Sequence, residues 1–211
     1  MFKKILALVL ATMMVLGGMV TVSAAEETAA AEEVVYDYTA AAEDLAALGI
    51  LKGDGIDFAL ENGVTRWQMA LFIARIMTGE TNDQYWNKVS DNTTPYSDVV
   101  NYFGAISFAD ENGIIKGKGW IPGVGDNCFD PNGAITYQDA ITMAVRALGS
   151  KQLAYPNGFL AVGEELGLME GLEPLAQDAA LTRGQMIQIL KNMLYVKVDG
   201  AASFAQQNFG L

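Results

Sequence analysis

One pattern recurs three times along this chain of 211 residues. Each copy contains an amphipathic helical segment, a glycine, a loop, and a second amphipathic segment that opens with threonine. The glycines are Gly49, Gly113 and Gly167, and the threonines are Thr65, Thr136 and Thr182. One helix–loop–helix of this size cannot bury its own apolar face, but three can share a core. The sequence therefore predicts a mainly α fold of three helix–loop–helix repeats with pseudo-threefold symmetry.

The spacing of apolar residues predicts where the helices lie. We expect the first helices at 41–48, 102–111 and 158–165, and the second helices at 66–77, 137–148 and 183–195. Glycine after each first helix suits a left-handed C-terminal turn. The middle loop is about seven residues longer than the other two.

The first 25 residues are typical of a secretory signal peptide. Lys3 and Lys4 precede an apolar run that ends in small residues at 22–25. An uncleaved membrane anchor is the alternative, since the run is nearly long enough to span a bilayer. The remaining expected parts are an acidic spacer at 26–37, repeats at 38–79, 96–149 and 150–196, a linker at 80–95 and a tail at 197–211.

The composition excludes several classes of function. Without the expected signal peptide the chain keeps 11 basic and 25 acidic residues, a net charge of −14, which argues against binding to duplex nucleic acid or to anionic lipid. No histidine is present, so His-dependent nucleophiles and metal sites are excluded. The lone Cys128 allows no intrachain disulfide and is more typical of a small buried residue than of a reactive thiol. No cofactor is expected.

The start of each second helix has the pattern of a capping box, in which a threonine and a residue three positions later satisfy free backbone groups. The pairs are Thr65 with Gln68, Thr136 with Asp139, and Thr182 with Gln185. Capping does not explain Arg66 and Arg183, because a cation is unfavourable at the positive end of a helix. Two interpretations stay open for these arginines: an anion site beside free helix N–H groups, or a packing or ion-pair role.

The stretches "LGILKGDGIDF" and "VTRWQMALFIARIM" of the first copy resemble the S-layer homology (SLH) motif. That motif has an aliphatic-Gly-Ile, a Gly-Asp-Gly loop and a Thr-Arg-Ala-Glu-like helix start, with an arginine ten residues after the threonine. Arg75 and Arg146 match the last spacing. Residues 96–119 resemble the first half of the motif, the third copy is weaker, and together the copies cover about residues 38–196.

The resemblance implies a secreted, non-catalytic anchor at the cell wall or S-layer. SLH triplets bind secondary cell-wall polysaccharides, often pyruvylated ones, in grooves between repeats. By this analogy the ligand-binding residues are Arg66 and Arg183, the loop residues Gly53, Asp54 and Gly55, and Lys118 where the second copy lacks the loop aspartate. Tyr137 replaces the arginine in the second copy, and the third copy lacks the loop glycines. One or two working grooves are therefore expected rather than three.

Three aromatic residues, Trp67, Trp120 and Tyr137, lie beside these helix starts or loops. Their faces suit either packing against a sugar ring or ordinary packing within the protein. If the arginines bind the ligand, replacing Arg66 and Arg183 with alanine should weaken wall binding and leave the fold intact.

Other functions fit the sequence less well. Residues 128–139 mimic a calcium-binding EF-hand loop, but Cys128 occupies the position of its first acid. Glu164 and Glu165 are better explained as exposed helical positions than as a glycosidase pair. Two alternatives to the anchor stay open: a structural S-layer or accessory wall protein that self-associates, and the anchor part of a longer wall-acting enzyme.

Overall fold

The computed structural model describes residues 35–52, 57–87, 94–198 and 200–211, which belong to one unit, Val35–Leu211. The expected signal peptide, most of the acidic spacer, and the loop residues Gly53, Asp54 and Gly55 lie outside the described residues. Among the described helices, none has the length and apolar character needed to cross a membrane.

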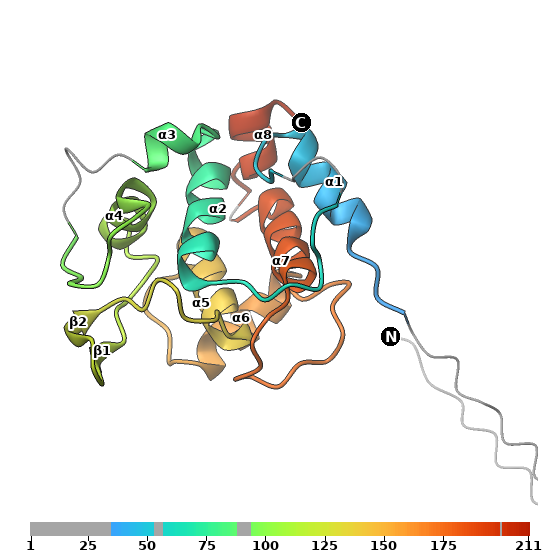
Figure 1. The fold of residues 1–211 in the computed structure, drawn as a ribbon. Helices are drawn as coiled ribbons and strands as arrows, with labels where there is room; N and C mark the ends of the chain where they lie inside the picture. Colours follow the sequence, from blue (N-terminus) through green and yellow to red (C-terminus); the bar gives the residue numbers. More distant parts are fainter. Residues whose placement is uncertain (1–34, 53–56, 88–93, 199) are drawn as a thin grey trace, which may run out of the picture. The chain divides into compact units, whose positions relative to one another are not determined.

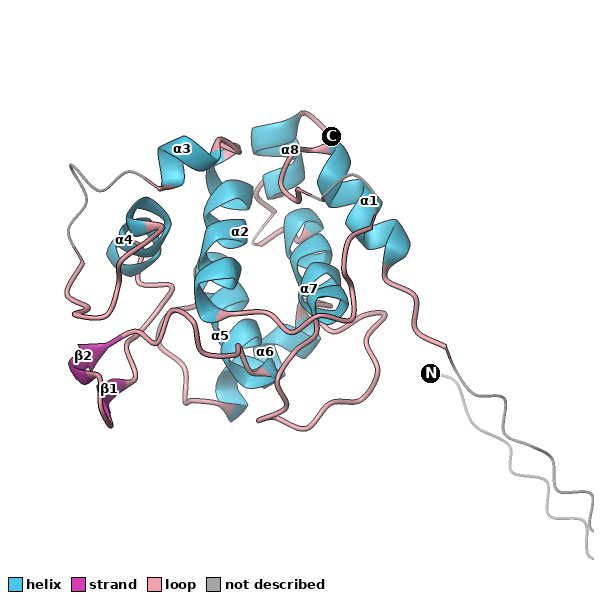
Figure 2. Ribbon diagram, viewed as in Figure 1, coloured by secondary structure: helices cyan, strands magenta, loops and turns pink. Residues whose placement is uncertain are grey.

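Six helices form three pairs at the expected places (Figures 1 and 2). The first pair is α1 (Thr39–Ala47) and α2 (Arg66–Thr78), the second is α4 (Phe103–Glu111) and α5 (Tyr137–Ala147), and the third is α6 (Asn157–Glu165) and α7 (Arg183–Tyr195). The predicted mainly α fold is confirmed, and each predicted helix end lies within two residues of the observed one.

Four short elements were not indicated by the apolar spacing. Helix α3 (Asp83–Trp86) lies in the expected linker, and α8 (Phe204–Phe209) lies in the expected tail. The antiparallel strands β1 (Gly119–Ile121) and β2 (Gly125–Cys128) form a hairpin in the long middle loop. All four are too short for a helical or strand period to be recognised in the sequence.

Helices from different pairs pack on one another in a cyclic order. Helix α4 packs on α2, α6 packs on α5, and α1 packs on α7, so each first helix contacts the second helix of the preceding pair (Figure 1). The second helices α2, α5 and α7 also contact each other. Their inward residues, including Met69, Ile73, Ile141, Ile187 and Leu190, are fully buried in one shared core.

A closed ring of backbone hydrogen bonds joins the three helix pairs just before their second helices. The N–H of Ile135 donates to the Val64 carbonyl (3.0 Å), that of Leu181 to the Ile135 carbonyl (3.0 Å), and that of Val64 to the Leu181 carbonyl (3.4 Å). All three side chains are buried. The burial of these side chains explains why an aliphatic residue precedes each threonine. The ring supports a threefold arrangement, although the symmetry itself stays a prediction.

The expected capping interactions are complete at the third of the second helices and partial at the other two, where the Thr65 hydroxyl has no hydrogen-bond partner among the described residues. Thr182 and Gln185 form a reciprocal capping box, and Thr136 Oγ1 accepts from the Asp139 N–H (3.4 Å). In the first pair, the Gln68 side chain accepts from the Thr65 N–H (2.9 Å). These bonds fix the point at which the chain turns from the ring into each helix.

Candidate functional site

The N–H groups at the start of each second helix are already bonded to the loop of a neighbouring pair. Those of Arg66 and Trp67 donate to the carbonyls of Gly133 and Pro131, those of Tyr137 and Gln138 to Ala179 and Gln177, and those of Arg183 and Gly184 to Asn62 and Leu60. Of the two interpretations left open for these arginines, the one that relied on free helix N–H groups is therefore contradicted at these positions. Any anion at these helices must be held by side chains.

Arg66 is buried, with 4% of its surface exposed, and its guanidinium group is fully engaged. Its Nε donates to the Phe129 carbonyl (2.9 Å), Nη1 pairs with Asp139 (2.7 Å), and Nη2 donates to the Lys116 carbonyl (3.2 Å). Burial lowers the pKa of Arg66, an effect that the nearby Asp139 charge opposes. Arg66 therefore connects α2 to the loop of the second pair, which corresponds to the ion-pair interpretation.

Asp139, in the first turn of α5, receives hydrogen bonds from three side chains. Besides Arg66, these are Lys118 (Nζ, 2.6 Å) and Tyr155 (hydroxyl, 3.0 Å). Burial alone would raise the pKa of Asp139, but the hydrogen bond from Lys118 and the charge of Arg66 outweigh it and hold the pKa below its usual value. Burial, with the Asp139 charge, raises the pKa of Tyr155 to about 12. Asp139 is therefore ionised and Tyr155 neutral at physiological pH.

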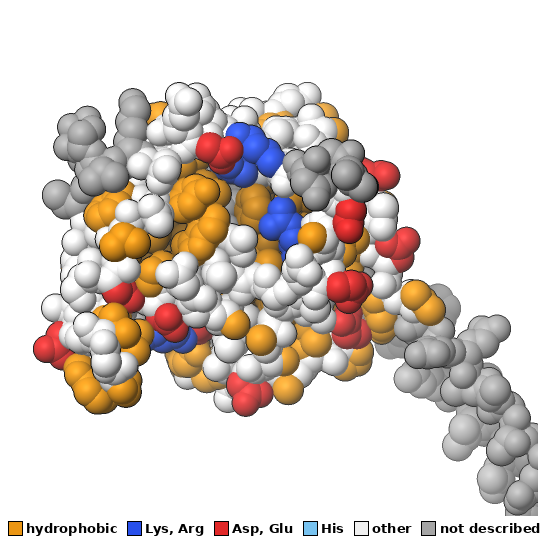
Figure 3. Space-filling model, in the orientation of Figure 1, with side chains coloured by type: hydrophobic (Ala, Val, Ile, Leu, Met, Phe, Trp, Pro, Cys, Tyr) orange, Lys and Arg blue, Asp and Glu red, His pale blue; other side chains and the backbone are white. Residues whose placement is uncertain are grey.

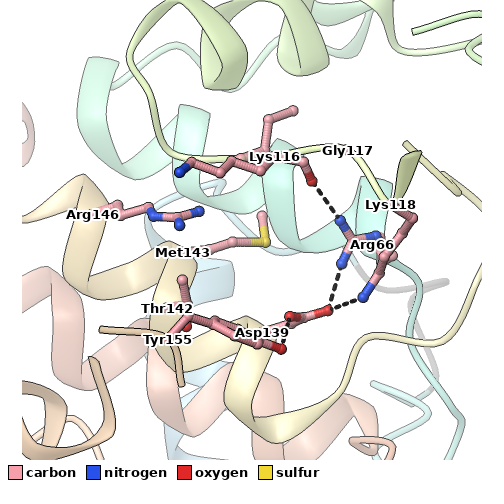
Figure 4. A pocket seen from close by; sticks show the side chains of 10 residues that line it. Arg66, Lys116, Gly117, Lys118, Asp139, Thr142, Met143, Arg146 and Tyr155 are labelled. Atoms are coloured by element: carbon pink, nitrogen blue, oxygen red, sulfur yellow. Dashed lines mark hydrogen bonds and ion pairs between the residues drawn. The ribbon is translucent and has the colours of Figure 1, made fainter. Parts of the chain in front are cut away.

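These residues line a pocket of about 350 Å³ (Figure 4). Its walls come from the start of α2, the loop before β1, the face of α5, and the segment before α6. The lining residues are Arg66, Ile115, Lys116, Gly117, Lys118, Asp139, Thr142, Met143, Arg146 and Tyr155. Four of them are basic and one is acidic, although the whole chain has a net charge of −12. The pocket is therefore locally cationic in an acidic protein.

Two buried polar atoms of this pocket have no hydrogen-bond partner. Arg146 is 7% exposed, and its Nη1 donates to the Ile114 carbonyl (3.3 Å) while its Nε has no partner. Thr142 is 3% exposed, and its hydroxyl is also unpaired. Both side chains extend from α5, and Figure 4 shows the Arg146 guanidinium directed into the pocket. Buried polar groups are normally satisfied, so these two point to a bound water or ligand.

Arg146 was not expected as a site residue. Its spacing from Thr136 was visible in the sequence, and that spacing is the signal that could have identified it. Of the residues expected to bind ligand, Arg66 and Lys118 line this pocket and Arg183 does not.

The interface between the third and first helix pairs has two arginines bonded in the same way as those of the cationic pocket. Arg183 Nη2 donates to the Lys52 carbonyl (3.4 Å), as Arg66 Nη2 does to that of Lys116. Arg75 Nη1 donates to the Ile50 carbonyl (2.6 Å), as Arg146 Nη1 does to that of Ile114. Asp83 forms ion pairs with both Arg75 and Lys52, as Asp139 does with Arg66 and Lys118. Among the described residues named here, three are basic and one is acidic, so this interface has one cation fewer than the pocket.

The position between the second and third pairs has neither arginine. Tyr137 stands where the other pairs have Arg66 and Arg183, and Asn192 stands where they have Arg75 and Arg146. The Asn192 amide donates to the carbonyls of Leu168 (3.1 Å) and Glu170 (2.8 Å). Neither of these two positions therefore supplies a cation for an anionic ligand.

The three aromatic candidates lie outside the cationic pocket. Trp67 stacks on Tyr102, with ring centroids 4.0 Å apart. Trp120 lies on the β1–β2 hairpin and is 65% exposed. Tyr137 is partly buried, which raises its pKa. Figure 3 shows hydrophobic side chains gathered between α2 and α4 and on the hairpin.

Comparison with known proteins places this chain beside proteins of the bacterial surface. It is 34% identical over 171 residues to a cell surface protein of Thermoanaerobacter kivui, 31% over 204 residues to a surface layer protein of Brevibacillus choshinensis, and 29% over 211 residues to a middle cell wall protein of Brevibacillus brevis. The chain is similar to S-layer-type proteins. No family model matches it.

The aligned regions cover 77%, 93% and 96% of this chain but only 21%, 17% and 19% of those relatives. The chain thus spans about a fifth of their length. The names support a secreted location at the cell wall or surface layer, and none of them is the name of an enzyme. The described residues contain no group of three or more acidic or cysteine side chains arranged to hold a metal ion.

Proposed function

We propose that this chain anchors a protein to the bacterial cell wall by binding an anionic secondary wall polysaccharide without a covalent bond. The observation that carries the proposal is the cationic pocket with its unpaired Arg146 Nε and Thr142 hydroxyl. The similarity to surface-layer and cell wall proteins supports the same role. The three helix pairs then correspond to three SLH repeats.

In this proposal the anion is held by the α5 side of the pocket. The Arg146 guanidinium is directed into the pocket, where it can form charge-assisted hydrogen bonds, and the Thr142 hydroxyl lies one helical turn before it. The exposed Lys116 side chain adds a second cation. A sugar-borne carboxylate, such as the pyruvyl ketal implied by the SLH resemblance, matches this set. Arg66 and Asp139 position the walls of the pocket rather than bind the ligand.

The other two interfaces rank below this one. The described part of the Arg183 interface has three cations against four in the cationic pocket, so it is expected to bind the polymer more weakly. The Tyr137 interface is not expected to bind it. The loop residues Gly53, Asp54 and Gly55 stay proposed ligand contacts of the Arg183 interface on the SLH resemblance alone.

Co-sedimentation with purified wall sacculi, before and after removal of the secondary polymer, tests the proposal. Binding should disappear with the polymer and fall at least about tenfold in Arg146→Gln, the equivalent of about 1.4 kcal/mol. Lys197→Gln removes one exposed charge outside the pocket and serves as the matched control. Undiminished binding of Arg146→Gln, or equal binding to stripped sacculi, would contradict the proposed site.

Self-association in a surface layer is a second candidate function, because the hairpin exposes two large apolar residues. Trp120 is 65% and Val124 is 58% exposed. Sedimentation velocity of the isolated chain should then show concentration-dependent oligomers that Trp120→Ser abolishes. A monomer at all concentrations would leave wall binding as the function of this chain. The greater length of the relatives also fits an anchor attached to a further domain, including a wall-acting enzyme.

A further inference from the structure

A second cavity, of about 190 Å³, lies beside the stacked pair of Trp67 and Tyr102. It is lined by Trp67, Val100, Asn101, Tyr102, Pro131 and Asn132. None of these residues lines the cationic pocket. Arg66 and Trp67 are adjacent in the sequence, yet they face different cavities.

An internal comparison shows how this cavity arises. Tyr38 and Tyr102 occupy equivalent positions, each directly before the first helix of a pair and each packed on the start of a second helix of another pair. Under Tyr38 the helix residue is Gly184, whose missing Cβ would lie only 2.5 Å from the Tyr38 ring. Tyr38 therefore settles onto α7 and is only 7% exposed.

Under Tyr102 the corresponding residue is Trp67, whose ring stacks on the tyrosine with an interplanar angle of 10°. The large indole prevents Tyr102 from settling onto α2 in the way Tyr38 does on α7, and both rings are partly exposed. The space that is closed in one pair is therefore open in the other.

The backbone of Tyr102 is also unusual. Its φ and ψ are 53° and 36°, a left-handed conformation that costs free energy for any residue with a side chain. The Asn87 side chain accepts a hydrogen bond from its N–H (3.0 Å) and holds it there. The chain thus keeps a bulky aromatic residue where glycine would be easier, and the result is an aromatic surface beside the cavity.

The chemistry of the lining residues identifies a ligand class. Among the residues that the structure describes, no charged side chain lines the cavity, in a protein where 18% of residues are charged. Aromatic rings pack against the C–H faces of sugars, and the exposed amides of Asn101 and Asn132 can both donate to and accept from neutral groups. The cavity is smaller than sites for drug-sized ligands, which limits it to about one sugar ring.

We propose that this cavity binds one uncharged sugar ring, of the N-acetylhexosamine type, as a site separate from the cationic pocket. The proposal rests on the proposed wall-binding function only for the source of the sugar, a wall glycan. Tyr102 and Trp67 provide the stacking surface, and Asn101 and Asn132 bind the hydroxyl and acetamido groups. The two sites together would let the chain contact both charged and uncharged parts of the wall.

The test uses the uncharged trisaccharide of N-acetylglucosamine as probe, followed by calorimetry and by ligand-observed NMR. Tyr102→Gly removes the ring and suits the left-handed backbone, so we expect a folded protein with no detectable binding. Asn132→Ala changes an exposed side chain and should weaken binding about tenfold, since it removes a hydrogen-bonding group from the site. Tyr195→Ala removes an exposed aromatic residue outside the cavity and should bind like the unmodified chain.

Arg146→Gln separates the two proposals. It should leave trisaccharide binding unchanged while reducing sedimentation with sacculi. Absence of saturable trisaccharide binding would overturn the uncharged-sugar site without affecting the anchor. The same holds if Asn132→Ala and Tyr102→Gly bind the trisaccharide as tightly as the unmodified chain does. Loss of trisaccharide binding in Arg146→Gln would show a single site and would also overturn it.

Discussion

Arg66 and Arg146 line the same pocket but differ in how completely their guanidinium groups are bonded. Arg66 has a partner for each of its three nitrogens, whereas the Nε of Arg146 has none. A buried guanidinium with a partner for every nitrogen stabilises the fold, whereas a buried donor without a partner costs free energy unless something binds it. At the residue scale, this difference supports a structural role for Arg66 and the proposed ligand-binding role for Arg146.

Replacing Arg66 should destabilise the protein, contrary to the expectation from the sequence. Arg66→Gln leaves the partly buried Asp139 without its arginine partner and removes the donor to the carbonyls of Phe129 and Lys116. Loss of one partner of a buried pair costs on the order of 3 kcal/mol. Chemical denaturation followed by circular dichroism measures the change. Lys118→Gln removes an exposed partner of the same carboxylate and should cost less than about 1 kcal/mol; equal losses would contradict the structural role.

Asp139 should make stability depend on pH in the acid range. Its pKa in the folded state lies below the ordinary value of 3.8, because Lys118 and Arg66 outweigh the opposing effect of burial. Its contribution is therefore complete above about pH 5 and is lost as the pH falls through the lower, folded pKa. The difference in unfolding free energy between the unmodified chain and Asp139→Asn should shrink below about pH 4. A difference that stays constant down to pH 2 would contradict a stabilising role for the ionised Asp139 carboxylate.

At the scale of elements, the caps of the second helices connect the ring to the core. Thr182→Ala removes the oxygen that accepts from the Gln185 N–H (3.3 Å) and should cost about 1 kcal/mol of unfolding free energy. Thr182→Ser keeps that oxygen and should recover most of the loss in the same urea titration. If serine and alanine were equally destabilising, the methyl group and not the cap would be responsible.

The sequence predicted the paired helices well because each has a buried face of apolar residues and a threonine or glycine at one end. It did not predict α3, α8 or the hairpin, although Ser203 and Gln206 form a capping box at α8 that was visible in the sequence. The contacts between pairs were not predictable in the same way. The carbonyls that bond the helix starts come from loops of other pairs, and sequence spacing carries no information about them.

Those contacts also explain why the site was predicted only in part. Arg66 and Lys118 were expected to bind the ligand and do line the pocket, but their pairing with Asp139 depends on how two helix pairs meet. Trp67 was expected beside Arg66, yet residues that are adjacent at a helix start point in different directions. Tertiary contacts, rather than motif positions, determine which residues share a cavity.

At the scale of the whole described unit, the packing is cyclic and not linear. Each first helix packs on the second helix of the preceding pair, and the backbone ring closes through all three pairs. In a linear repeat protein, loss of a terminal repeat removes one interface and leaves the rest folded. In a closed arrangement, loss of one pair opens two interfaces.

A chain restricted to residues 35–149 should therefore fail to fold cooperatively. It lacks α6, which packs on α5, and α7, which packs on α1. It also lacks the carbonyls that accept hydrogen bonds from the N–H groups of Val64, Tyr137 and Gln138. Residues 35–211 should unfold in urea in one sigmoidal transition by circular dichroism, whereas 35–149 should show low helicity and a gradual, non-cooperative change. A sharp transition for 35–149 would show that two pairs form a stable core alone. Cyclic closure would then not be required for folding, although 35–149 would still lack Tyr155, which lines the cationic pocket.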